Sequence, residues 1–124
     1  MTRINAGVAV RLLVNKHLLA EHREIKRIPN LIKSGRMSNK DAPTKFTLGT
    51  GHMKFFYNKQ LFLLNRYKEI YAECINRGLN VQNYESAWDG IDSKLMNDYT
   101  PTKQDEHLVI ERILERLTTM GLVV

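Results

Sequence analysis

Side chains that could do chemistry recur at helical spacing within the first 27 residues. His17, Glu21 and Glu24 are three or four residues apart, so a helix would place them on one side. An adjoining basic stripe has three members: Lys16, Arg23 and Arg27. A carboxylate among cations stays charged and can stabilise a cation that develops on a sugar. By spacing alone, an ordinary amphipathic helix with ion pairs four residues apart is the better interpretation.

The N-terminus offers a nucleophile. A methionine followed by a small residue is usually removed, so we expect Thr2 to become the first residue. An α-amino group has a pKa of about 7.7–8.0, against about 10.4 for lysine, so much of it is unprotonated near neutrality. A free amine can attack a carbonyl-like carbon and form an imine.

Other kinds of site are disfavoured. His17 and His22 are five residues apart, roughly 140° around a helix, so we expect no metal site. Gly49 and Gly51 precede a helix without the Lys-Ser/Thr pair of a nucleotide loop, although this turn could hold one phosphate. The single cysteine, Cys74, lies in an apolar stripe and is predicted to be core. We expect neither a metal nor an organic cofactor.

Positive charge is concentrated at one end of the chain. The net charge is +6, and residues 1–45 alone carry ten Lys/Arg against three Asp/Glu. Such clustering favours a polyanion such as nucleic acid, although a solvated basic face would also account for it. No apolar run approaches the roughly 20 residues that cross a bilayer. We expect one cytoplasmic, monomeric domain over residues 1–124 with no membrane contact.

The apolar pattern predicts an all-α fold of three principal helices with long irregular loops. The first covers about residues 8–25, limited or kinked by Pro29, with a short helical turn over 28–32. Residues 34–50 form a loop, a second helix covers 55–75 and stops at Gly78, and 79–99 are irregular. Thr100-Pro101 predicts the start of the third helix. Its apolar face has four members: Ile110, Ile113, Leu114 and Leu117.

Several motifs, in order along the chain, carry a resemblance. They are Met1-Thr-Arg-Ile-Asn5, His17-Leu-Leu-Ala-Glu-His-Arg-Glu24, Gly51-His-Met-Lys-Phe-Phe-Tyr57, Ala72-Glu-Cys-Ile-Asn-Arg-Gly78 and Asp98-Tyr-Thr-Pro101. With these blocks the chain resembles the pyrimidine-dimer DNA glycosylase family.

The resemblance implies a DNA-repair glycosylase with abasic-site (AP) lyase activity, acting on double-stranded DNA that carries damaged bases or abasic sites. In such enzymes the amine matching Thr2 attacks the deoxyribose C1′, and the carboxylate matching Glu24 stabilises the cationic sugar. A nucleotide opposite the lesion leaves the stack. The resemblance and the basic stripe together give the expected DNA-binding residues: Arg3, Lys16, His17, Arg23, Arg27, Arg112 and Arg116.

Two departures from the family pattern bear on specificity. The family's best-known member ends in an aromatic-rich tail, whereas residues 117–124 hold no aromatic side chain here. The only tryptophan, Trp88, lies in the second loop, where we expect it to serve packing, and His22 replaces a family tyrosine. The alternative function is a non-catalytic protein of the same fold that binds nucleic acid or a nucleotide. A third reading is a helical interaction module.

Overall fold

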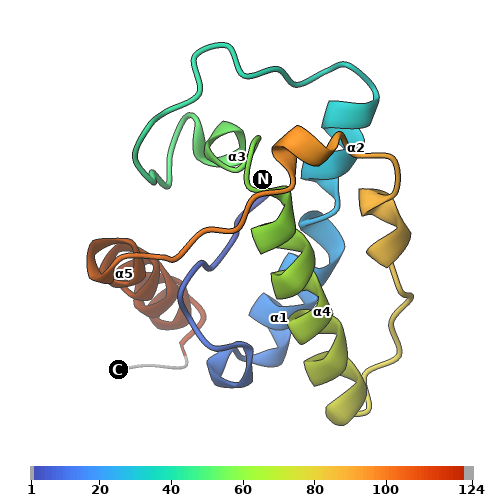
Figure 1. Cartoon of the computed structure of the whole chain (residues 1–124). Helices are drawn as coiled ribbons and strands as arrows, with labels where there is room; N and C mark the ends of the chain where they lie inside the picture. Colours follow the sequence, from blue (N-terminus) through green and yellow to red (C-terminus); the bar gives the residue numbers. More distant parts are fainter. Residues whose placement is uncertain (1, 122–124) are drawn as a thin grey trace.

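A computed structural model describes residues 2–121 of the chain; Met1 and the last three residues of the tail lie outside the described residues. The described part contains helices and no strand, which confirms the all-α prediction. Its elements, in order, are a 3₁₀ turn η1 (Val10–Leu12), α1 (Asn15–Glu24), α2 (Arg27–Lys33), α3 (His52–Phe55), α4 (Gln60–Asn76), η2 (Glu85–Trp88), η3 (Ser93–Leu95) and α5 (Lys103–Thr119). Figure 1 shows α1 and α4 together, with α5 to one side.

The core forms where α1 meets α4. Leu18 and Ile25 from the first helical region and Leu63 and Ile70 from α4 are fully buried. Residues seven apart repeat after two helical turns, so each pair lies on one face. Tyr67 is also fully buried, and its hydroxyl accepts a hydrogen bond from the Tyr84 backbone N–H at 2.6 Å.

Cys74 and Trp88 are both buried, as core positions should be. The Trp88 and Tyr67 ring centroids are 5.4 Å apart, so the tryptophan serves packing here.

The first predicted helix is wrong at its start. The chain forms the η1 turn before α1 begins at Asn15, and Leu12, which lies within the predicted range of 8–25, is 67% exposed. Pro29 does not end a helix but occupies the first turn of α2. The missing proline N–H costs little there, because N–H groups of a first turn have no partner within the helix.

The second predicted helix is two helices. Gly51, at φ 93°, precedes the short α3, and the chain leaves helical geometry at Lys59 before α4 begins. The predicted stop is confirmed, since Gly78 adopts φ 74°, a left-handed conformation that glycine takes without strain. The intervening loop over 34–50 is also confirmed.

The third predicted helix is present but starts later and faces differently. Thr102, rather than Thr100, caps α5, in a capping box with Asp105. Val109 is fully buried, whereas Ile110 and Leu114 are 45% and 49% exposed. The predicted apolar face is therefore wrong at Ile110 and Leu114, whereas Ile113 packs against the core as predicted. Val109 is one residue, or about 100° of helix rotation, away from Ile110.

Candidate active site

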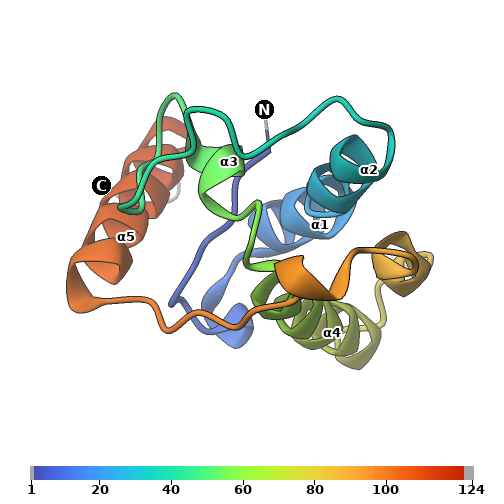
Figure 2. The same cartoon turned by 45° about the horizontal axis from the view of Figure 1, so that its top comes forward.

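Residues 2–5 are held in an extended path by His52. The Ile4 backbone N–H donates to His52 Nε2 at 2.9 Å, and the opposite ring nitrogen, Nδ1, lies 2.7 Å from the Thr47 carbonyl oxygen. An acceptor nitrogen on one side and a donor on the other require a neutral imidazole. Burial lowers the pKa of His52 to about 4, which keeps the ring neutral. Figure 2 shows the anchored segment passing between α5 and α1.

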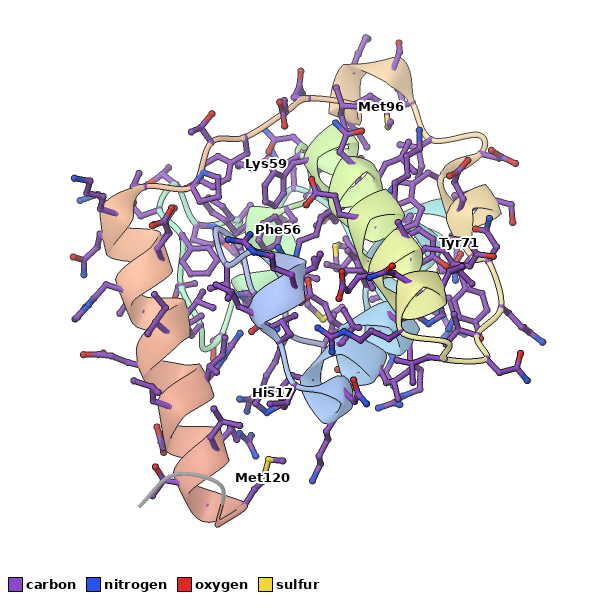
Figure 3. All side chains as sticks on the ribbon, turned by 90° about the horizontal axis from the view of Figure 1, so that it is seen from below. His17, Phe56, Lys59, Tyr71, Met96 and Met120 are labelled. Atoms are coloured by element: carbon purple, nitrogen blue, oxygen red, sulfur yellow. The ribbon has the colours of Figure 1, made fainter. Side chains whose placement is uncertain are left out.

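A pocket of about 340 Å³ lies where this segment meets α1 and α5. His17 and Met120, labelled in Figure 3, belong to its α1 side and its α5 side. Six of the nine predicted site residues line it: Arg3, Lys16, His17, Glu24, Arg112 and Arg116. A second hollow of about 380 Å³ shares the three arginines, so these cations can be approached from two sides.

Two polar atoms of this pocket are buried without a partner among the described residues. They are Nη1 of Arg112 and Nδ1 of His17. A guanidinium nitrogen can only donate, so the free Nη1 of Arg112 calls for an acceptor such as a phosphate or sugar oxygen. The pocket is therefore built for an anionic, oxygen-rich ligand.

The surrounding cations shift the titration of their neighbours. Burial, and next the charge of Arg3, lowers the pKa of Arg112 to about 10, still far above neutrality. Burial, followed by the charges of Lys16 and Arg116, lowers the pKa of His17 below its ordinary value. His17 is therefore neutral at physiological pH, whereas Arg112 remains charged.

Glu24 supplies a negative charge at the pocket wall. Its side chain is 14% exposed, and one carboxylate oxygen lies 3.3 Å from Nη2 of the exposed Arg23. An ion pair with an exposed partner is weak, so this contact leaves the carboxylate free to serve another cation. A cationic sugar within the pocket would lie among the cations with Glu24 as its counter-ion.

Three predicted residues do not line the pocket. Arg23 and Arg27 are exposed at the end of α1 and the start of α2. Thr2 is 2% exposed, and its hydroxyl is buried with no partner among the described residues. It directly precedes Arg3, which does line the pocket, so Thr2 is one residue away from the pocket lining.

Sequence reasoning missed several residues that shape the site. Asn5 lines the pocket, and Arg66 of α4 forms a buried ion pair with Glu21. Arg66 lies between the apolar residues Leu63 and Tyr67 in an otherwise apolar stripe. A cation at a core position was the one signal that could have indicated a buried partner.

Within residues 2–121 there is no cluster of three or more metal-ligating side chains. No helix in that range is long and apolar enough to cross a membrane.

A comparison with protein families agrees with this geometry. The family model described as pyrimidine dimer DNA glycosylase matches residues 1–85 of the 124. The match includes Thr2, Arg3 and Glu24, the anchoring His52, and every helix from α1 to α4. It ends before α5, which supplies Arg112 and Arg116. The chain belongs to the pyrimidine dimer DNA glycosylase family, so its activity class is that of a DNA-repair glycosylase that binds damaged DNA.

Proposed function

We propose that the chain removes damaged bases, pyrimidine dimers included, with the Thr2 amine as nucleophile and then breaks the strand as an AP lyase. The observation that supports this most strongly is the pocket. It joins a carboxylate, four cations and an unpartnered guanidinium donor one residue from Thr2.

The proposed chemistry balances without a metal or organic cofactor. The Thr2 nitrogen forms a bond to C1′ of the deoxyribose, and the glycosidic bond breaks with its electron pair on the departing base, which takes up a proton. Opening of the sugar ring gives a protonated imine between Thr2 and C1′. Loss of a C2′ proton then expels the 3′ phosphate, and water later releases the amine.

Glu24 and the arginines have complementary roles in these steps. The Glu24 carboxylate stabilises the sugar while positive charge develops at C1′ and assists proton transfers. Arg3, Arg112 and Arg116, with Lys16 and His17, hold the phosphate and sugar oxygens around the lesion. A lost contact of this electrostatic kind typically costs about 10²–10³ in rate.

Arg23 and Arg27 extend the positive surface beyond the pocket. Both are exposed, so they suit phosphates of the flanking duplex and add affinity without sequence preference. We propose that one copy of the chain engages double-stranded DNA in this way.

Reductive trapping tests the nucleophile. Borohydride reduces an imine to a stable amine, so the protein with a free Thr2 terminus should crosslink permanently to duplex DNA with an abasic site. Intact-mass measurement establishes that Met1 has been removed. One residue added before Thr2 should abolish the crosslink while the thermal transition stays unchanged.

Glu24→Gln tests the carboxylate. It keeps the side-chain shape but removes the charge, so base excision should fall by at least two orders of magnitude. Binding of lesion DNA should be at least as tight as in the parent, because repulsion between carboxylate and phosphates is lost. Glu69→Gln, an exposed position on α4, is the matched control and should behave as the parent.

The same assays separate the alternatives. A crosslink that survives the added residue and maps to a lysine would overturn the role of Thr2. Salt-dependent DNA binding without any crosslink or incision would identify a non-catalytic binding protein instead.

A further inference from the structure

The buried ion pair of Glu21 and Arg66 forms a rigid support beneath the pocket. Glu21 is 2% and Arg66 is 7% exposed. Arg66 Nη2 donates to Glu21 Oε1 at 3.0 Å, and Nε donates to the other carboxylate oxygen. Arg66 Nη1 donates to the Val8 carbonyl oxygen at 2.9 Å. With its donors committed in this way, the pair has one well-defined geometry.

Asn5 connects this buried ion pair to Arg112, a cation of the pocket. Its Nδ2 donates to Glu21 Oε1 at 2.8 Å, and its Oδ1 accepts from Arg112 Nη2 at 3.3 Å. A carboxylate can only accept and a guanidinium can only donate, so the two partners fix the orientation of the amide between them. Asn5 is 7% exposed and lines the pocket itself.

The hydrogen bond from Arg112 to Asn5 connects helix α5 to the N-terminal segment. Within residues 2–121, the bond from Arg112 to Asn5 is the one side-chain hydrogen bond between α5 and any residue before Tyr99. Figure 1 shows α5 set to one side of the α1 and α4 pair. The second terminal nitrogen of Arg112 is buried and unpartnered, so this one bond directs the guanidinium that can receive the ligand.

The same side chain also belongs to the catalytic segment. Asn5 follows Thr2 by three residues, and the backbone between them is held at Ile4 by His52. The position of Arg112 is thereby tied to the position of the chain end, although 107 residues separate Arg112 from Asn5.

We propose that Asn5 is a positioning residue, which aligns the Arg112 guanidinium with the Thr2 amine by tying both to the buried Glu21–Arg66 pair. This inference rests on the proposed function. Asn5 itself needs no contact with the reacting atoms. Its contribution should therefore appear in the rate at saturation and should depend on Arg112.

A double-mutant cycle tests this dependence. N5A, R112A and N5A/R112A are compared by the rate of borohydride trapping on saturating abasic-site duplex, well below the thermal transition of each. N5A removes the hydrogen bonds to both Glu21 and Arg112. It should slow trapping about ten-fold, the effect expected from losing the hydrogen bond that orients the charged Arg112. It should leave DNA affinity and its salt dependence within about two-fold, since no charge is removed. The double variant should be no slower than R112A, which is the signature of coupled residues.

Controls keep the outcomes distinct. Asn80→Ala, at an exposed position that does not line the pocket, should trap at the parental rate. If N5A fails to fold, N5S replaces it in the cycle, since a hydroxyl then remains beside Glu21. Effects of N5A and R112A that multiply, or an N5A defect confined to affinity, would overturn the positioning role. A parent that forms no crosslink would refute the proposed function itself.

Discussion

The anchoring histidine should give the protein a measurable loss of stability in acid, which His52→Gln removes. Glutamine offers an amide acceptor and donor in place of the two ring nitrogens but does not titrate. In the folded chain the pKa of His52 is lowered to about 4 from its ordinary value of 6.5, with burial as the largest cause. The ring in the folded chain therefore resists protonation that the unfolded chain accepts.

The direction and size of the effect on the free energy of unfolding follow from the difference in the pKa of His52 between the folded and unfolded chains. As pH falls below 6.5 the unfolded chain gains a proton at His52 and the folded chain does not, so unfolding becomes easier. The contribution is complete above pH 6.5 and is lost progressively down to about pH 4. At 1.36 kcal/mol for each pKa unit, the full loss is about 3 kcal/mol. A loss of that size is a large part of the 5–15 kcal/mol typical of domain stability.

The assay is denaturant unfolding of parent and His52→Gln at several pH values between 7.5 and 4. The difference in free energy of unfolding between them isolates His52, because His17, His22 and all carboxylates are common to both. That difference should shrink by about 3 kcal/mol as pH falls. His107→Gln, whose side chain is 66% exposed, is the matched control and should show no comparable trend. A parent-to-variant difference that stays constant down to pH 4 would refute the neutral, buried ring.

Three further predictions concern binding, specificity and stability. The affinity for duplex DNA should fall steeply with salt, with a log–log slope of about −0.9 for each phosphate neutralised, and Arg23→Ala or Arg27→Ala should flatten that slope by about one. Fluorescence anisotropy at several salt concentrations measures the slope, and an affinity independent of salt would refute the prediction. With no aromatic side chain in residues 117–124, incision at abasic sites should exceed incision at cyclobutane dimers. Rapid dimer incision in competition with undamaged duplex would show that aromatic side chains in residues 117–124 are not needed for dimer recognition. Thr102→Ala should lower the free energy of unfolding by about 1 kcal/mol through loss of the α5 cap, whereas Thr100→Ala should have little effect.

Local sequence signals predicted the features that depend on near neighbours. The three-to-four spacing of apolar residues gave the helices, and Gly78 marked the end of α4 because a left-handed residue favours glycine. The pairing of His17 with Glu24 on one side of α1 also holds, since both line the pocket. Of the predicted basic stripe, Lys16 lines the same pocket, whereas Arg23 and Arg27 do not.

Long-range partners decided what remained unpredicted. Arg112 of α5 is half-buried and donates a hydrogen bond to Asn5, and no pattern within α5 reveals that partner. The cap of α5 is the exception, because it was missed although its signal is local: Asp105 completes a capping box three residues after Thr102. His52 was noticed only as part of a motif, since its role depends on the backbone of Ile4, 48 residues earlier.

The pocket is assembled from opposite ends of the chain, and this has a consequence for folding order. Arg3 and Asn5 come from the first residues, and Arg112 and Arg116 come from the last helix. Most buried core residues lie in the segment between them, from Leu13 to Trp88. A nascent chain can therefore collapse around α1 and α4 before the ribosome has made α5.

Contact between Asn5 and Arg112 closes a long loop, but the entropic cost of closure grows only with the logarithm of the loop length. This contact cannot form before residue 112 has been synthesised. We therefore expect partly synthesised or partly unfolded chains to keep a helical core yet lack the cationic pocket.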